Sequence, residues 1–369
     1  MSVVRKKIYA MDNCEYCALP LVFDTYSKCS HDCVYCYTKM SHCGLNLSED
    51  TEANAGLQLA SALSAQKETS VSKLINSKFP VRLGILADPF PEDERKKGVT
   101  LKALYELLFK KQKIIISTKS IIPVESDYFD LLRRNKELVV MKYSFSTFDD
   151  KLARKIEPGA PLPSERIDAM VKLGKVGVST LLRIQPFIFG VSWNDRTFIA
   201  LERLKGFCKR VTVELLRVNK TAKAYAQVIF DKLGISCEDY FQGIQDMESP
   251  FYGAHHWYHY DGDFLRQEYL KIRKKVNRYG MSFGICGLYD GLANVDLNEG
   301  AFCCQINDEQ SFDKKALCTI KRREQAIDIV EQFDNVTLKE YYEKYADGTN
   351  NISFARYLRV RGELDNLLF

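Results

Sequence analysis

The sequence predicts an α/β fold, a partial (β/α)6 barrel followed by a mostly helical C-terminal extension. Continuous apolar runs alternate with amphipathic segments between residues 21 and 216, which is typical of parallel strands joined by right-handed helical crossovers. Past about residue 220 this alternation stops. We therefore expect an N-terminal segment over 1–20, the barrel over 21–220 and the extension over 221–369.

The expected strands are short runs rich in Val, Ile, Leu and Phe. They lie at 21–26, 81–87, 113–118, 138–146, 178–188 and 210–216. Segments with helical spacing of apolar residues lie between them, at 51–67, 101–111, 124–134, 164–177 and 196–207. Six such strands suit a partial TIM-like barrel, in which functional residues stand at the carboxyl ends of the strands.

The composition is that of an ordinary globular protein, with 46% hydrophobic and 27% charged residues. Lys and Arg number 53 and Asp and Glu 48, so the net charge of +5 permits a nucleic-acid partner without indicating one. We find no signal-peptide pattern and no run of 18 apolar residues, and expect a cytoplasmic protein without a membrane span. In that compartment the 12 cysteines favour metal binding over disulfides.

Three cysteines stand together directly after the first expected strand, in the segment Cys29-Ser-His-Asp-Cys33-Val-Tyr-Cys36-Tyr37. Cysteine thiolates are the usual ligands of iron–sulfur clusters, so this loop predicts a [4Fe–4S] cluster on Cys29, Cys33 and Cys36. Three protein ligands leave one iron open, which can chelate the amino and carboxylate groups of S-adenosylmethionine (SAM). The alternatives are a zinc site completed by the upstream Cys-x2-Cys pair, or thiols that bind nothing.

Further motifs follow at the ends of the expected strands. In chain order they are Asp24 to Tyr37, Asp88-Pro-Phe-Pro91 with Glu92, Ser117-Thr-Lys-Ser120, Ser144-Phe-Ser-Thr147, Glu157-Pro-Gly159 with Glu165-Arg166, and Arg183-Ile-Gln-Pro186. Over about residues 20–195 they resemble the radical SAM family that contains spore photoproduct lyase and the DNA repair photolyase-like proteins. The resemblance implies a barrel of the radical SAM type, a [4Fe–4S] cluster, SAM cleaved to a 5′-deoxyadenosyl radical, and a reductant such as flavodoxin or ferredoxin.

The resemblance also implies a set of cofactor-binding residues. Lys119 and Ser144 are similar in position to residues that contact SAM, and Tyr35, Ser146 and Arg183 are expected to share that site. Read without the resemblance, Lys119 could be a solvated lysine at a strand end. The Ser144 hydroxyl could equally be bonded to backbone within the core.

The candidate catalytic residues are Tyr37, Asp88 and Glu92. The two carboxylates could contact substrate, or instead cap the helix that starts near Thr100. Spore photoproduct lyase uses an additional cysteine near its second strand end as a hydrogen-atom donor, and residues 83–88 contain none. We therefore expect a divergent relative that does not repair the spore photoproduct itself. A substrate radical would then be quenched by Tyr37, by a thiol or by regeneration of SAM.

Two groups of residues outside the barrel motifs are further candidates. An auxiliary iron–sulfur cluster or zinc ion could use cysteines of the extension and the N-terminal segment, which are Cys286, Cys303, Cys304, Cys318, Cys14 and Cys17; the alternative is that these are buried structural thiols. Segment 251–264 is dense in aromatic residues, and Trp257 and Tyr258 could stack on a base. That segment could instead pack the extension onto the barrel, or bind a metal through His255 and His259.

The expected function is that of a radical SAM enzyme acting on a thymine-like or modified nucleobase in DNA, on the strength of the family resemblance. The reaction class stays open between lyase, isomerase and transferase. A radical SAM enzyme for a small metabolite or peptide is the alternative that the modest charge favours. A non-catalytic iron–sulfur or zinc protein is the third, and the ordered motifs beyond the cysteines speak against it.

Overall fold

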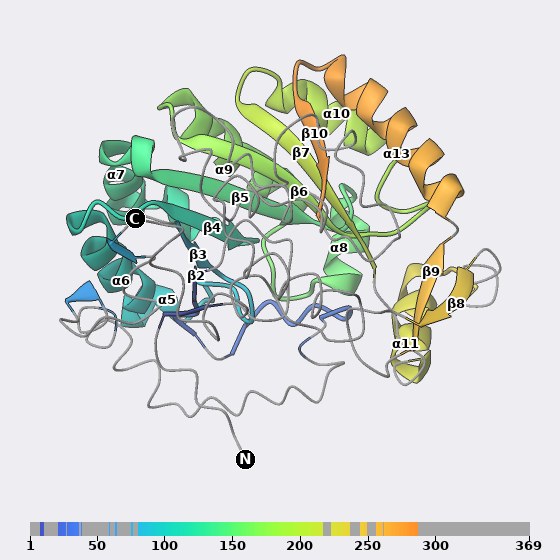
Figure 1. Cartoon of the computed structure of the whole chain (residues 1–369), viewed down its shortest axis with the longest axis horizontal. Helices are drawn as coiled ribbons and strands as arrows, with labels where there is room; N and C mark the ends of the chain where they lie inside the picture. Colours follow the sequence, from blue (N-terminus) through green and yellow to red (C-terminus); the bar gives the residue numbers. More distant parts are fainter. Residues whose placement is uncertain are drawn as a thin grey trace, which may run out of the picture.

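The computed structural model describes residues 8–10, 21–26, 28–36, 38, 59, 63–64, 75–76, 80–216, 223–236, 244–248, 256–260 and 262–286. One large sheet with helices packed against it dominates this part of the chain (Figure 1). Its strand order is β1-β2-β3-β4-β5-β6-β7-β10. Strand β1 is antiparallel to β2, and the other seven strands run parallel to one another.

The strands of the large sheet are β1 (Tyr9–Ala10), β2 (Leu21–Phe23), β3 (Val81–Leu83), β4 (Ile114–Thr118), β5 (Val139–Phe145), β6 (Ser179–Phe187), β7 (Cys208–Leu215) and β10 (Ser282–Ile285). A separate antiparallel hairpin consists of β8 (Ile244–Glu248) and β9 (His256–Tyr260). The helices are α5 (Glu94–Lys97), α6 (Val99–Phe109), η1 (Ile122–Val124), α7 (Ser126–Arg134), η2 (Lys136–Leu138), α8 (Asp150–Ile156), α9 (Pro163–Lys175), α10 (Asp195–Leu204), α11 (Lys223–Leu233) and α13 (Gly262–Asn277).

Helices α6, α7, α9, α10 and α13 cover one face of the sheet, which we call the outer face (Figure 1). Alternate strand residues, such as Met141 and Tyr143 of β5, share one buried apolar cluster with these helices. Successive side chains of a strand point to opposite faces, so Lys142 and Ser144 of the same strand face away from the helices. We call that side the inner face.

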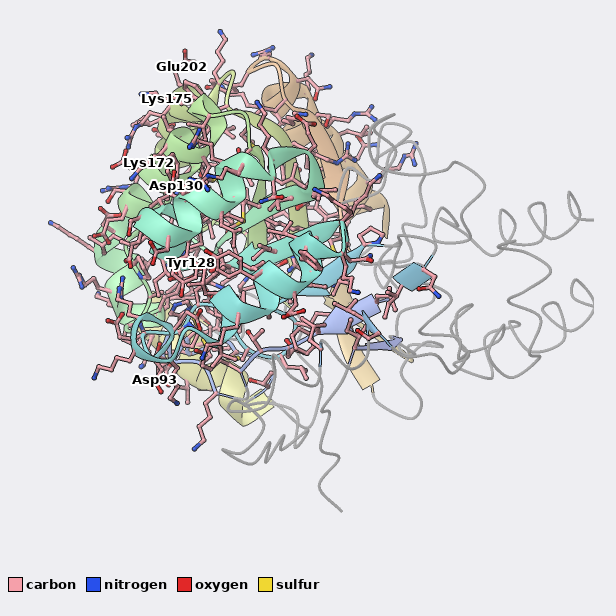
Figure 2. All side chains as sticks on the ribbon, turned by 90° about the vertical axis from the view of Figure 1, so that its left-hand side faces the viewer. Asp93, Tyr128, Asp130, Lys172, Lys175 and Glu202 are labelled. Atoms are coloured by element: carbon pink, nitrogen blue, oxygen red, sulfur yellow. The ribbon has the colours of Figure 1, made fainter. Side chains whose placement is uncertain are left out.

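The helices of the outer layer are amphipathic. Their exposed surfaces bear charged side chains such as Asp130 of α7, Lys172 and Lys175 of α9, and Glu202 of α10 (Figure 2). Local signals set their ends: the Asn194 side chain caps α10 by accepting a hydrogen bond from the backbone N–H of Arg196 at 3.0 Å. Within the described residues, none of the helices combines the length and the apolar character that a membrane span requires.

The predicted partial barrel is confirmed, with one difference in how far it extends along the chain. The sheet does not end near residue 220, because β10 pairs in parallel with β7 through Ser282 to Ile285. Helix α13 precedes β10, as the helix of one more strand–helix unit would. The interruption by α11 and the β8–β9 hairpin hides this unit in the sequence. The helix expected over 51–67 lies mostly outside the described residues.

Candidate functional site

The cysteine loop follows β2 at the carboxyl end of the parallel strands. Cys33 is buried, Cys36 is half-buried, and Cys29, Cys33 and Cys36 all carry free thiols. Desolvation raises the pKa of Cys33 to about 12, and the nearby Lys119 ammonium works in the opposite direction. Within the described ranges, no three Cys, His, Asp or Glu side chains converge as the ligands of one metal ion.

A buried carboxylate, Glu157, ties the cysteine loop to the barrel. It accepts hydrogen bonds from the Tyr35 hydroxyl in the loop and from the Ser146 hydroxyl at 2.7 Å, and it forms an ion pair with Arg166. Burial alone would favour the neutral acid, but Arg166, Lys119 and these two hydrogen bonds hold the pKa of Glu157 at about 2. The charged carboxylate therefore holds the Tyr35 side chain in place next to Cys36.

Backbone contacts from the same segment hold the rest of the loop. The N–H of Val34 donates to the carbonyl of Ile156 at 2.9 Å, and the N–H of Gly159 donates to the carbonyl of His31 at 3.0 Å. A Cβ atom at residue 159 would lie 2.0 Å from the carbonyl oxygen of Ser30. Only glycine allows this close approach, which explains the Glu-Pro-Gly order of the motif.

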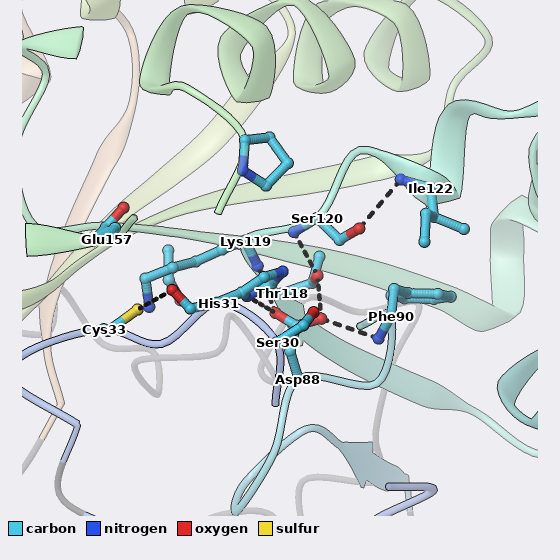
Figure 3. Close-up of polar contacts among 12 residues, drawn as sticks. Ser30, His31, Cys33, Asp88, Phe90, Thr118, Lys119, Ser120, Ile122 and Glu157 are labelled. Atoms are coloured by element: carbon cyan, nitrogen blue, oxygen red, sulfur yellow. Dashed lines mark hydrogen bonds and ion pairs between the residues drawn. The ribbon is translucent and has the colours of Figure 1, made fainter. Parts of the chain in front are cut away.

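Asp88, at the carboxyl end of β3, links three strand ends (Figure 3). Its Oδ1 accepts from the backbone N–H of Phe90 at 2.9 Å and the hydroxyl of Thr118 at 2.7 Å. Its Oδ2 accepts from the backbone N–H of Lys119 at 2.7 Å and lies 3.4 Å from Nδ1 of His31. Burial lowers the pKa of His31, although Asp88 opposes that effect, so a neutral imidazole faces the carboxylate.

These contacts bear on the two predicted catalytic carboxylates. Asp88 is committed to structure-building hydrogen bonds, whereas Glu92 is exposed and paired with Arg95. Neither caps the helix at Thr100, because the buried Glu94 accepts from the backbone N–H of Thr100 at 3.0 Å. A catalytic role for Asp88 or Glu92 stays a prediction.

Lys119, at the end of β4, points toward the cysteine loop. Its Nζ lies 5.6 Å from the centre of the Tyr35 ring, a cation–π distance. Its charge lowers the pKa of both Cys29 and Cys33, although desolvation dominates for each thiol. Among the described residues no carboxylate lies within ion-pair distance of this ammonium. Whether Lys119 contacts SAM stays a prediction.

The other predicted cofactor residues lie on β5 and β6. Ser144 and Arg183 are register partners on the inner face, and the carbonyl of Ser144 accepts from Arg166 at 2.9 Å. Ser146 is fully engaged, because its hydroxyl donates to Glu157 and its carbonyl accepts from Ser192 at 2.5 Å. Arg183 forms an ion pair with Glu214 of β7. A cofactor-binding role for Ser144, Ser146 or Arg183 stays a prediction.

Several predicted residues lie outside the part of the chain that the structure describes. These are Tyr37, His255 and the cysteines 14, 17, 303, 304 and 318. Trp257, Tyr258 and His259 belong to β9, of which only the backbone is described. Cys286 directly follows β10, with its Sγ 3.8 Å from Nη2 of Arg183.

The sequence analysis did not single out the charged side chains on the inner face. Lys142 interrupts the mostly apolar strand VVMKYSF, and Arg210 and Glu214 stand in CKRVTVEL. Lys142 and Arg210 are 1% exposed, and charged residues are seldom buried so completely. A charged residue within a strand expected to be buried is the signal that could have identified them.

Comparison with known proteins supports the fold. No family model matches the chain. An uncharacterized protein, ORF301, of Acidianus two-tailed virus is 32% identical over 74 residues, which is 20% of this chain and 24% of that protein. The chain thus matches only about a quarter of the length of this curated relative.

Two solved structures of spore photoproduct lyase mutants are similar to this chain. One has a TM-score of 0.51 at 14% identity, and the other, with bound AdoMet and dinucleoside spore photoproduct, has 0.50 at 13% identity. Each match covers 73% of this chain and 76% of the other. The chain therefore has the partial-barrel fold of radical SAM enzymes. Its likeness is in particular to spore photoproduct lyase, the enzyme whose family the sequence motifs resemble, so the predicted resemblance is confirmed at the level of the fold.

Proposed function

We propose that this protein is a radical SAM enzyme that acts on a thymine-like or modified nucleobase in DNA. The observation that carries the proposal is the position of three free thiols on one loop at the carboxyl end of the sheet, beside a lysine without an ion-pair partner among the described residues. The shared fold supports it, since a lyase of that fold binds AdoMet and a dinucleoside photoproduct.

The donor set fits a [4Fe–4S] cluster. Each thiolate of such a cluster binds a different iron, so Cys29, Cys33 and Cys36 need not converge on a single ion. A cluster with three protein ligands, once bound and reduced, supplies the electron that cleaves SAM to a 5′-deoxyadenosyl radical. A reductant such as flavodoxin or ferredoxin, in the cytoplasm, would deliver that electron.

The chain's own residues hold and orient these groups. Glu157 and Gly159 fix the shape of the cysteine loop through Tyr35 and the loop backbone. Lys119 offers a cation to the carboxylate of SAM, an ionic hydrogen bond worth about 1.5–3 kcal/mol. Asp88 sets the position of Lys119 by accepting its backbone N–H at 2.7 Å.

The nucleobase substrate follows from the resemblance and from the dinucleoside bound by the similar lyase. Because residues 83–88 contain no cysteine, we propose chemistry other than simple reversal of the spore photoproduct. The competing proposal is a small metabolite or a peptide as substrate. DNA affinity that falls steeply with salt would favour the first, and saturable metabolite binding without DNA affinity the second.

Iron loading and SAM cleavage test the proposed chemistry. Anaerobically reconstituted protein should hold about four irons at this loop and, when reduced, form 5′-deoxyadenosine. A variant with Cys29, Cys33 and Cys36 all changed to Ala, here the three-cysteine variant, should lose that iron and the cleavage. Cys208→Ala is the matched control, because Cys208 lies in the helix-facing core and should not affect either. A three-cysteine variant that keeps its iron and cleaves SAM would refute the proposal.

A further inference from the structure

Helix α13 carries a row of cations on its exposed side. Its buried side repeats at intervals of three and four residues, with Leu265, Tyr269, Ile272 and Val276 at most 2% exposed. Lys271, Lys274 and Arg278 follow the same intervals on the other side and are all exposed. The backbone N–H of Arg278 donates to the carbonyl of Lys275 at 3.2 Å, which continues the last turn. Residues three and four apart are neighbours on a helix surface, so the three cations form one row, which we call the α13 stripe.

The charge of the α13 stripe is mostly unbalanced. Among the described residues, neither Lys274 nor Arg278 forms an ion pair. Lys271 pairs with Glu268 at 2.5 Å, but its side chain is 71% exposed, and a surface pair of this kind is worth about 1 kcal/mol or less. Lys271 can therefore exchange this partner for another anion at little cost.

The neighbouring outer helices differ, because their exposed cations stand beside acidic residues. Arg133 of α7 pairs with Asp130, and Arg203 of α10 pairs with Asp168 of α9. Segment 262–278 instead holds six Lys or Arg residues and two acidic ones, a net charge of +4 where the whole chain has +5. Such an excess on one surface helix indicates a polyanionic partner.

Helix α13 lies at one edge of the large sheet, beside β10, which is the last strand in the sheet order (Figure 1). Strand β10 begins shortly after α13 ends and runs parallel to β7. The α13 stripe, in the second half of the helix, therefore lies toward the amino ends of the strands. The start of α13 lies toward their carboxyl ends, where the cysteine loop stands. At 1.5 Å per residue, the 16 residues of α13 extend about 24 Å between these two edges.

We propose that the α13 stripe binds the phosphate backbone of the DNA that carries the substrate base. This rests on the proposed nucleobase substrate, because a base in DNA brings a polyanion with it. From Lys271 to Arg278 the stripe extends about 10 Å, the axial rise of roughly three nucleotides of one strand. Contacts to phosphates position a duplex without reading its sequence, which leaves recognition of the base to the carboxyl edge of the sheet.

An acidic reductant protein is the other partner that a cationic row could fit. A reductant must approach the cysteine loop to deliver its electron, and that loop lies at the opposite ends of the strands from the α13 stripe. A duplex that lies along α13 can contact the stripe and still extend to the carboxyl edge. The position of the stripe therefore favours DNA.

The salt dependence of DNA binding tests the proposal. The stripe variant carries Lys271→Gln, Lys274→Gln and Arg278→Gln in the full-length protein, and affinity for a fluorescently labelled duplex is measured by anisotropy over a range of salt concentrations. Each lost phosphate contact makes the slope of log K against log salt less steep by about 0.9, so we expect a change of about 2–3. The affinity at low salt should fall at least tenfold, and equally for two duplexes of unrelated sequence.

A matched control removes the same charge elsewhere. The control variant carries Lys102→Gln, Arg134→Gln and Lys136→Gln, which are exposed residues of α6, α7 and η2. Charges further apart than about 10 Å are largely screened at 0.1 M salt, so its slope should stay that of the wild type. Both variants change only exposed side chains, and both should keep the wild-type melting temperature, iron content and 5′-deoxyadenosine formation without DNA.

A wild-type slope in the stripe variant would overturn the proposal, and so would an equal change in the control variant, since net charge alone would then act. Absence of DNA affinity in the wild type at low salt would overturn it as well. Slower reduction of the cluster by flavodoxin in the stripe variant, with DNA affinity unchanged, would assign the stripe to the reductant instead. The proposed radical chemistry fails by a different measurement, namely iron content and 5′-deoxyadenosine formation in the three-cysteine variant.

Discussion

Replacing Arg166 by Met should destabilise the protein strongly. Arg166 is fully buried, donates to the carbonyls of Ser144 at 2.9 Å and Pro161 at 2.8 Å, and pairs with Glu157. The variant would leave the Glu157 carboxylate buried without its main cation. The fall of the Glu157 pKa from 4.5 to about 2, to which Arg166 is the largest favourable contributor, corresponds to roughly 3.5 kcal/mol at about 1.4 kcal/mol per unit. Breaking a buried ion pair costs about 3–5 kcal/mol, so we expect a loss of about 3 kcal/mol in urea unfolding.

The pH dependence gives this prediction a second readout. Because the folded-state pKa of Glu157 lies below its unfolded value, its contribution is present above pH 4.5 and is lost as the pH falls toward 2. Glu157→Gln should therefore flatten that part of the stability profile. Arg203→Met, at an exposed pair with Asp168, is the control and should change stability by less than about 1 kcal/mol. A loss below 1 kcal/mol in Arg166→Met would refute the reasoning.

Three further predictions concern the cysteine loop and its surroundings. Lys119→Ala should weaken SAM binding at least tenfold by calorimetry, and unchanged affinity would remove Lys119 from the cofactor site. Gly159→Ala should lower the melting temperature by several degrees and reduce iron incorporation, because the added methyl would lie 2.0 Å from the carbonyl of Ser30; a variant that folds and loads iron normally would contradict this. Metal analysis of the three-cysteine variant tests the auxiliary site: residual iron or zinc indicates one, and its absence makes Cys286 and the other thiols structural.

Much of the fold was accessible from the sequence because parallel strands leave a simple pattern. The run IIIST of β4 is buried at every position, and β5 and β6 are buried at most of theirs. Motif residues at strand ends were also predictable, since carboxyl ends of parallel strands share one edge. Asp88, Lys119 and Glu157 do lie together beside the cysteine loop.

The roles of individual residues were less accessible. Glu157 and Arg166 form a buried pair only because α8 and the turn after it bring them together, and spacing alone does not give that geometry. Asp88 was predicted as a substrate contact or a helix cap, but it accepts hydrogen bonds from Phe90, which follows β3, and from Thr118 and Lys119 at the end of β4, and these strand ends meet only in the folded barrel. The side chain that caps this helix is that of Glu94, and the sequence does not distinguish it from the exposed charged residues around it.

Because β10 lies far along the chain from β7, the large sheet can be completed only late in synthesis. Residues 282–285 pair with residues 210–213, so the sheet stays incomplete during synthesis until about seventy more residues have left the ribosome. Until then, the open edge of β7 offers unpaired backbone groups between Val211 and Val213, a template for association with other chains. A fragment truncated at residue 220 would carry that exposed edge permanently, and we expect it to aggregate. The barrel therefore requires β10, which follows β7 in the sequence only after α11, the β8–β9 hairpin and α13.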